Sequence, residues 1–278
     1  MKPTILGVVT LYNPDIESAN NNIQQYAPYV EKVIVWDNSP ICHQSQIVGD
    51  NLIYHWTGQN TYIAPAINYA WEYAQANSYD LILIMDQDSH WANFSFFRTK
   101  VEELYAQEHN VYVPYIAGND NWIFDKEIVE RRIFINSGTI IPTDILTAIN
   151  GADEVFEMDA LDHDLAIRIQ KANYKILCIT SCILYHTVGH PKRSKWLHLF
   201  TNDYGRERTY SIAKCHLIKY RKHKKWFTPA DKRKIFKEYY MWKFIRLVLV
   251  EEDKIGRFKM FVKGIHDGFR FDLSKTKQ

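Results

Sequence analysis

The sequence predicts an α/β protein with a mostly parallel β-sheet flanked by helices, followed by a basic helical C-terminal region. Short apolar segments alternate with longer amphipathic ones in the first part of the chain, and several apolar segments end in clusters of Asp, Asn and Ser. The charge also changes sign along the chain. Met1–His190 carries 10 Lys and Arg against 23 Asp and Glu, whereas Pro191–Gln278 carries 24 against 9. We therefore expect two regions with different electrostatic roles, residues 1–200 and residues 201–278.

Composition excludes several other classes of protein. The 278 residues are 46% hydrophobic and 24% charged, which excludes a largely disordered chain. Only 11 Gly and 9 Pro are present, so collagen-like and low-complexity classes are excluded too. No apolar run reaches the roughly 18 residues of a membrane span, and the N-terminus does not resemble a signal peptide. We therefore expect a cytoplasmic protein.

The elements follow from hydrophobic periodicity. Thr4–Leu11 is a continuous apolar run typical of a buried strand, and a turn at Tyr12–Asp15 separates it from an amphipathic stretch, Ile16–Tyr26. By the same reasoning, further strands are predicted at Lys32–Trp36, Asn51–Trp56, Asp80–Met85, Val111–Ala117, Arg132–Pro142, Lys175–Ile179 and Cys182–Tyr185. Further helices are predicted at Ile63–Gln75, Asp162–Ala172, Tyr204–Tyr220 and Arg233–Val250.

Polar clusters follow three of the predicted strands, at Thr10–Asp15, Asp37–Ser39 and Asp86–Ser89. Ligands of open parallel sheets bind beyond the carboxyl ends of the strands. We therefore expect these three clusters to lie close together in space and to form the functional site.

Asp86 and Asp88 flank one residue at the end of a fully apolar strand. Two carboxylates in this arrangement can hold a hard divalent cation such as Mg²⁺ or Mn²⁺, which prefers oxygen ligands and bridges to phosphates. A turn or helix-capping cluster is the alternative, because Asp favours both. The spacing alone leaves the two interpretations equal.

A second acidic cluster, Asp159–Leu165, opens a predicted helix. Neighbouring carboxylates repel one another when all are ionised, so one of them is a candidate for a raised pKa. A carboxylate of this kind can act as a general base. The alternative is helix N-terminal chemistry, in which Asp satisfies free amides and the helix dipole. Taken alone, the cluster favours that alternative.

Seven segments occur in the order that one enzyme family shows, and they span roughly the first 210 residues. They are Val9–Asp15 (VTLYNPD), Val33–Ser39 (VIVWDNS), Asn60–Asn68 (NTYIAPAIN), Leu83–Ser89 (LIMDQDS), Asn136–Gly138 (NSG), Met158–Tyr174 and Leu184–Gly189 (LYHTVG). In this order they resemble a family 2 glycosyltransferase of the GT-A fold, of the bacterial surface-polysaccharide type that includes rhamnosyltransferases. Tyr62 and Asn173 stand where the family pattern has Gly.

The resemblance implies roles for individual residues. Asp88 would bind the metal ion, Mn²⁺ or Mg²⁺, at the donor diphosphate, and His186 would complete the metal or diphosphate site. Asp162 would be the catalytic base. The residues implied to bind the nucleotide part of the donor are Thr10, Tyr12, Asp37, Asn60 and Asp86.

Two of these assignments have structural alternatives. A single histidine at a strand end, as at His186, is more often a hydrogen-bonded structural residue than a metal ligand. Asn60 is as well suited to cap a helix as to line a donor pocket.

The basic C-terminal region interleaves Lys and Arg with Trp, Tyr and Phe. This composition favours contact with an anionic membrane surface, for which Lys219–Phe227 and Trp242–Val250 are the best candidates. A solvated basic surface is the alternative. Nucleic acid is not expected as a partner, because no nucleic-acid-binding motif is present.

The sequence therefore predicts an inverting, metal-dependent glycosyltransferase. It would move a sugar from a nucleotide-diphosphate donor, a UDP- or dTDP-sugar, to a hydroxyl of a glycan or lipid-linked acceptor in surface polysaccharide synthesis. We expect it in the cytoplasm, at the inner face of the cytoplasmic membrane. The alternative is a catalytically weak nucleotide-sugar-binding or scaffold protein of the same fold.

Overall fold

The computed structural model describes residues 2–117, 125–186, 192–193 and 200–277. The chain forms two compact units, which we describe separately. The first comprises Met1–Glu154 and Leu165–Thr187, with Gln278, and the second comprises Val155–Asp164 and Val188–Lys277. Sequence patterns give no sign that Val155–Asp164 packs with residues of the C-terminal region.

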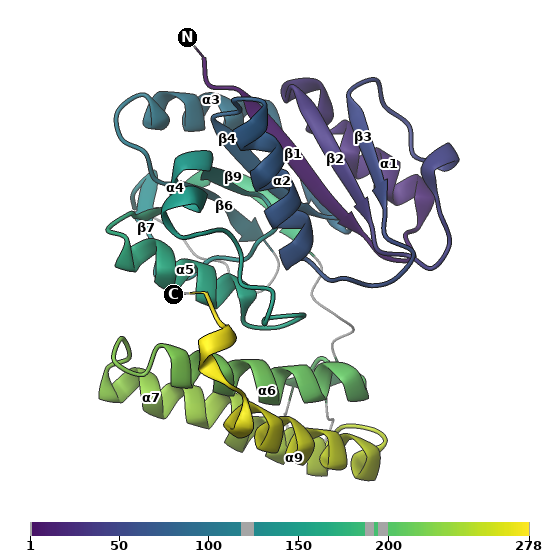
Figure 1. The fold of residues 1–278 in the computed structure, drawn as a ribbon, viewed down its shortest axis with the longest axis vertical. Helices are drawn as coiled ribbons and strands as arrows, with labels where there is room; N and C mark the ends of the chain where they lie inside the picture. Colours follow the sequence, from purple (N-terminus) through teal and green to yellow (C-terminus); the bar gives the residue numbers. More distant parts are fainter. Residues whose placement is uncertain (1, 118–124, 187–191, 194–199, 278) are drawn as a thin grey trace. The chain divides into compact units, whose positions relative to one another are not determined.

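A mixed β-sheet forms the centre of the first unit (Figure 1). Its strand order is β3-β2-β1-β4-β8-β6-β9-β5, with β7 paired to β9. The first four strands in this order are parallel to one another, whereas β8 runs antiparallel to both of its neighbours. The strands are β1 (Ile5–Leu11), β2 (Lys32–Asp37), β3 (Leu52–Trp56), β4 (Leu81–Asp86), β5 (Ser89–Trp91), β6 (Val111–Ala117), β7 (Ile128–Glu130), β8 (Thr139–Pro142) and β9 (Ile176–His186). The predicted α/β architecture is confirmed.

Helices flank this sheet because both of its faces are apolar. Alternate residues of β1, such as Ile5 and Val9, belong to one core cluster with residues of α1 (Ile16–Gln24) and α3 (Phe94–Tyr105). On the opposite face, α2 (Ala64–Ala76) packs on β1 and β4 (Figure 1). Burial on both faces accounts for the continuous apolar runs of the parallel strands.

The prediction of one strand over Arg132–Pro142 is wrong in its first half. The strand β8 begins only at Thr139, because Asn136–Gly138 turns the chain. Gly138 has a φ of +79°, and a Cβ there would lie 2.7 Å from Leu184 Cδ2 and 2.9 Å from Pro114 Cγ. A side chain is therefore excluded at this turn.

The two strands predicted at Lys175–Ile179 and Cys182–Tyr185 are one strand, β9. The register against β6 shifts between Pro114 and Tyr115, which pair with Ile179 and Ile183. A bulge of this kind inserts extra residues without ending a strand. The sequence analysis did not predict β5, β7, α3 or α4 (Thr143–Ala148).

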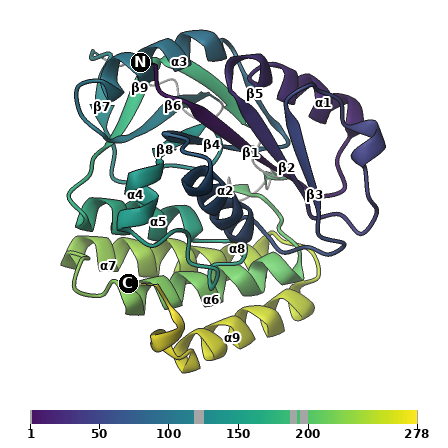
Figure 2. The same ribbon diagram turned by 45° about the horizontal axis from the view of Figure 1, so that its top comes forward.

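The second unit is mainly helical. It contains α6 (Arg206–Lys222), α7 (Pro229–Phe236), a π-helical turn η3 (Lys237–Trp242), α8 (Lys243–Leu249) and α9 (Lys254–Arg270). It also contains a short antiparallel pair of strands, β10 (Lys192–Arg193) and β11 (Phe200–Thr201). Figures 1 and 2 show α6 and α9 side by side, in agreement with their many contacts. Among the described helices, none combines the length and apolar composition that crossing a bilayer requires.

The helix α9 was not predicted, and its glycines explain why. Glycine inside a helix costs about 1 kcal/mol relative to alanine, so it argues against a helix in sequence analysis. Here a Cβ at Gly264 would lie 2.5 Å from the Tyr210 carbonyl oxygen, and one at Gly268 would lie 2.9 Å from that of Lys214. The two glycines therefore permit the close approach of α9 to α6.

Candidate functional site

Three strands of the first unit end at one edge of the sheet. In register, Thr10 of β1 lies between Trp36 of β2 and Asp86 of β4. Asn13, just after β1, donates its backbone N–H to Ser39 Oγ at 2.8 Å. The three polar clusters that follow these strands are therefore neighbours, as the sequence predicted.

Gln87 joins two of these clusters. Its side-chain Oε1 accepts the backbone N–H of Tyr12 at 2.7 Å, and its Nε2 donates to the Tyr12 carbonyl at 3.2 Å. Its own carbonyl accepts from Asn22 Nδ2 at 2.8 Å. These bonds hold the segment after β1 against the Asp86–Asp88 turn, a role that the sequence motif does not reveal.

Asp86, Asp88 and His186 form the acidic centre of this edge. Each offers a ligand atom, and these atoms lie within 4.8 Å of one another. Asp86 is the last residue of β4 and His186 the last of β9, whereas Asp88 lies in the turn that leads into β5. Two carboxylates and an imidazole suit a divalent cation such as Mn²⁺, whose remaining positions would be open to phosphate oxygens. Asp88 and His186, which were predicted for the metal site, thus lie beside Asp86, which was predicted to bind the nucleotide, and their ligand roles stay a prediction.

Two buried serines fix the imidazole of His186. Ser89 pairs with His186 across β5 and β9, and its Oγ lies 2.7 Å from His186 Nδ1. Ser137 Oγ donates to Ser89 Oγ at 2.8 Å and accepts the backbone N–H of Asp86 at 3.1 Å. His186 Nδ1 lies 3.6 Å from Asp88 Oδ1. The histidine is therefore hydrogen-bonded, as its structural interpretation expected, and also adjacent to both carboxylates.

We expect Ser89→Ala to weaken metal binding about tenfold or more, because hydrogen bonds that orient a ligand typically change metal affinity by 10- to 100-fold. Mn²⁺ titration by calorimetry measures this, with the exposed Ser45→Ala as the matched control. A Ser89→Ala protein that binds Mn²⁺ within twofold of the wild type would contradict the orienting role.

Asp37 is fully buried at the end of β2, and its carboxylate has many donors. It accepts the backbone N–H of Ser39 at 2.9 Å, the Nδ1 of His43 at 2.9 Å and the hydroxyl of Tyr54. Burial acts to raise the pKa of this carboxyl, but the hydrogen bonds from Ser39, Tyr54 and His43 outweigh it and hold the pKa below its usual value. Asp37 therefore stabilises the loop after β2, and its direct contact with a nucleotide stays a prediction.

The other predicted donor-binding residues differ in exposure. Thr10 is half-buried, and the Tyr12 side chain is exposed. Asn60 is exposed as well, and its Oδ1 accepts the backbone N–H of Tyr62 at 2.9 Å. The alternative of Asn60 as a helix cap is wrong, because α2 begins after Ile63. Their contacts with a donor stay predictions.

Tyr62 and Asn173, the two departures from the family pattern, both adopt left-handed backbone conformations. Their φ angles are +63° and +66°. This is the region that glycine adopts without steric cost, and glycine is what the pattern has at both positions. The backbone of these two segments therefore keeps a conformation suited to glycine although the side chains differ.

We expect Asn173→Ala to lower the free energy of unfolding by about 1 kcal/mol, because alanine lacks the tolerance of Asn for the left-handed region. Asn173→Gly should leave stability unchanged or raise it. Urea denaturation of both variants measures the difference. Equal stability of the Ala and Gly variants would contradict this account.

Asp162 lies in the first turn of α5 (Leu161–Lys171), and residues up to Asp164 belong to the second unit. Its Oδ1 accepts the backbone N–H of His163 at 2.8 Å. Burial raises the pKa of Asp162, opposed by that hydrogen bond and by the charges of Lys219 and Arg208. Burial also raises the pKa of Asp159 to about 6, again opposed by Arg208. The raised pKa expected for this cluster is thus present at both carboxyls.

Lys219 of α6 is buried beside this cluster. Its Nζ lies 2.9 Å from His163 Nδ1 and 2.8 Å from His216 Nδ1. Burial lowers the pKa of Lys219 to about 8, although the charges of Asp162 and Asp164 act to raise it. Burial lowers the pKa of His163 to about 3, with Lys219 as the second cause, so this imidazole is neutral at pH 7. Lys219 is therefore one of two cations, with Arg208, that support the ionised form of Asp162.

Asp164 and Arg168 have structural roles. Asp164 is fully buried, and its Oδ1 lies 2.7 Å from Lys222 Nζ and 2.8 Å from His223 Nε2 within the second unit. Arg168, in the first unit, donates to the carbonyls of Ile149 and Gly151. Of the acidic residues in this segment, Asp162 and Asp159 are left as candidates for proton transfer.

No protein-family model and no curated protein sequence matches the chain. Solved structures match its fold. TarS 1–349 of S. aureus in complex with UDP-GlcNAc has a TM-score of 0.59 at 14% identity, over 96% of this chain and 81% of that chain. The structure of GalNAc-T7 with UDP, GalNAc and Mn²⁺ also matches the fold. Its TM-score is 0.55 at 9% identity, over 89% of this chain and 57% of that chain.

A third match is the mannosyltransferase PcManGT from Pyrobaculum calidifontis in complex with GDP-Man and Mn²⁺. Its TM-score is 0.54 at 13% identity, with 99% of this chain and 78% of that chain covered. These three structures are glycosyltransferases of the GT-A fold. The chain therefore has the GT-A fold, as the sequence predicted.

Proposed function

We propose that the chain is a metal-dependent, inverting glycosyltransferase. It moves a sugar from a nucleotide-diphosphate donor to a hydroxyl of a glycan or lipid-linked acceptor, in surface polysaccharide synthesis. The observation that carries the proposal is the Asp86, Asp88 and His186 cluster at the carboxyl edge of the parallel strands. Ligands of such sheets bind at this edge, and these residues would hold a cation that binds the diphosphate of the donor.

The comparisons support the class of donor. The matching structures hold UDP-GlcNAc, or UDP with GalNAc and Mn²⁺, or GDP-Man with Mn²⁺. All of these are nucleotide diphosphates, with or without their sugar. For this chain we propose a UDP- or dTDP-sugar as donor and Mn²⁺ or Mg²⁺ as cofactor.

In the proposed reaction, the oxygen of an acceptor hydroxyl forms a bond to the anomeric carbon of the sugar. The bond from that carbon to the diphosphate oxygen breaks, and its electron pair leaves with the nucleoside diphosphate. Asp162 takes the proton of the hydroxyl as a carboxylate. Asp86, Asp88 and His186 would hold a divalent cation, which would supply positive charge to offset the charge on the departing diphosphate.

The pH dependence of the reaction follows from the surroundings of Asp162. Only the ionised carboxylate accepts a proton. The rate of transfer is therefore full at pH values above the Asp162 pKa, and it falls as the pH drops below that pKa. Lys219→Met removes a cation that lowers this pKa. We therefore expect the acid limb of the pH–rate profile to move to higher pH in Lys219→Met. The exposed Lys224→Met is the control, and an unmoved limb would contradict the role of Lys219.

The alternative is a nucleotide-sugar-binding or scaffold protein of low activity with the same fold. The two functions are separated by incubating the protein with Mn²⁺ and a panel of nucleotide sugars. Slow release of sugar from one donor supports the enzyme, whereas saturable binding of a donor without release supports the alternative.

A further inference from the structure

The outer surface of α9 exposes a stripe of apolar side chains. Ile255, Phe258, Val262 and Phe269 are 73%, 43%, 47% and 62% exposed. Their spacing of three, four and seven residues places them on one side of the helix. This stripe therefore faces away from the contacts that α9 makes with α6 inside the second unit.

A second apolar stripe lies on η3 and α8. Met241, Phe244 and Val248 are exposed and follow one another at spacings of three and four residues. The rings of Phe244 and Phe258 meet edge to face, with their centroids 6.2 Å apart. The second stripe thus meets the α9 stripe at Phe258, and we call the surface made of Met241, Phe244, Val248, Ile255, Phe258 and Val262 the apolar face.

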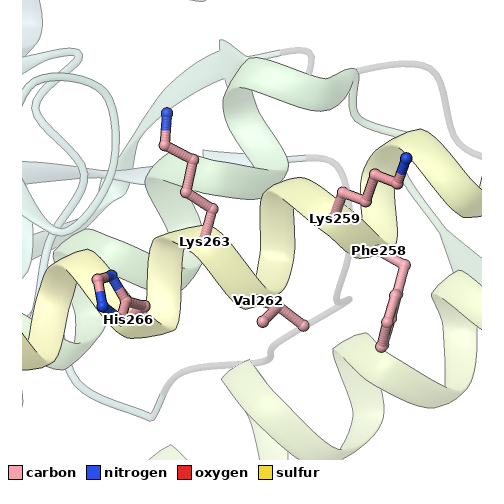
Figure 3. A pocket seen from close by; sticks show the side chains of 5 residues that line it. All are labelled: Phe258, Lys259, Val262, Lys263 and His266. Carbon is pink, nitrogen blue, oxygen red and sulfur yellow. The ribbon is translucent and has the colours of Figure 1, made fainter.

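Basic side chains border the apolar face. Lys254, Lys259, Lys263 and Arg270 of α9 are exposed. In Figure 3, Lys259 and Lys263 point away from Phe258 and Val262, and because they are one position further along α9 they flank these apolar side chains. The one carboxylate of this helix, Asp267, accepts the hydroxyl of Tyr210 at 2.8 Å. The exposed surface of α9 therefore carries more Lys and Arg than Asp and Glu.

We propose that the apolar face docks on a membrane surface that contains anionic lipid headgroups. Apolar side chains then enter the boundary between headgroups and acyl chains, while the flanking Lys and Arg side chains contact the phosphates. Charge favours this occupant over a second copy of the chain, because two such faces would bring like charges together. The proposal does not depend on the sugar-transfer activity.

The structure changes which residues are suited to this contact. Trp242–Val250, predicted from the sequence, contributes Phe244 and Val248. The prediction for Lys219–Phe227 is wrong in part, because Lys219 and His223 are buried within the second unit. The sequence analysis did not predict α9, so its stripe was missed.

Flotation of the full-length chain with vesicles tests the proposal. We expect binding to vesicles of phosphatidylcholine with 30% phosphatidylglycerol, and much weaker binding to phosphatidylcholine alone. Phe258→Asp with Val262→Asp should lower partitioning at least tenfold. Lys259→Glu with Arg270→Glu should also lower partitioning about tenfold or more, because each basic side chain near an anionic surface raises membrane affinity about fivefold.

The control is Lys32→Glu with Lys126→Glu, which makes the same change of charge at two exposed lysines of the first unit. We expect it to bind nearly as the wild type does. Three outcomes would overturn the proposal: no binding to anionic vesicles, binding that the Phe258 and Val262 substitutions leave unchanged, or an equal loss in the control. A fourth contradicting outcome is measured by light scattering: the wild type is a dimer, and the Phe258 and Val262 substitutions make it a monomer. The apolar face would then bind a second copy of the chain rather than a membrane.

Discussion

Asp162→Asn is expected to lower the rate of sugar transfer by about 10² to 10⁴-fold, the usual contribution of a general base. Asparagine keeps the size of the side chain but accepts no proton at working pH. Binding of the donor with Mn²⁺ should stay close to that of the wild type, because Asp162 is not one of the three proposed metal ligands. Rate and donor affinity are measured separately, by transfer assays and by titration calorimetry.

The matched control for this variant is Asp50→Asn. Asp50 is exposed and precedes β3, so it lies at the edge where the parallel strands begin rather than where they end. It should transfer sugar at the wild-type rate. If a folded Asp162→Asn protein were as active as Asp50→Asn, another group would have to take the proton.

Asp88→Ala is expected to lower the efficiency of sugar transfer by about 10² to 10³-fold, comparable to the loss of one preorganised electrostatic contact. The variant removes one carboxylate ligand and leaves Asp86 and His186 in place. A partial recovery at high Mn²⁺ concentration should follow, because the two remaining ligands still bind the cation weakly. Activity measured over a range of Mn²⁺ concentrations tests this.

Asp50→Ala is the control for the loss of a carboxylate. It should need no more Mn²⁺ than the wild type. An Asp88→Ala protein whose activity and Mn²⁺ requirement match those of Asp50→Ala would exclude Asp88 from the metal site.

The apolar runs in the sequence and the rule that parallel strands end at one edge were sufficient to predict which residues meet at the carboxyl edge of the sheet. Continuous apolar runs at β1, β2 and β4 indicate parallel strands buried on both faces, and parallel strands end at one edge. Thr10, Asp37 and Asp86 therefore had to be neighbours. His186 comes from β9, far along the chain, and only the resemblance placed it at the same edge.

Contacts between distant segments were not predictable from one sequence. Nothing in Val155–Asp164 reveals that it packs with α6, so the burial of Lys219 beside Asp162 was missed and that lysine was assigned to a surface. The same limit applies to α9, where Gly264 and Gly268 lower helix propensity and make sense only against the backbone of α6. Ser89 and Ser137 are unremarkable in sequence, and their link to His186 depends on strand pairing.

The central claim is that Asp86, Asp88 and His186 hold a divalent cation through which a nucleotide diphosphate binds. Titration calorimetry of UDP, dTDP and GDP into the wild-type protein, with Mn²⁺ or with EDTA, tests it most directly. The account predicts that at least one nucleotide binds with Mn²⁺, that EDTA abolishes this binding, and that Asp88→Ala weakens it strongly. Equal affinity in Mn²⁺ and EDTA, or no binding of any nucleotide diphosphate, would contradict it.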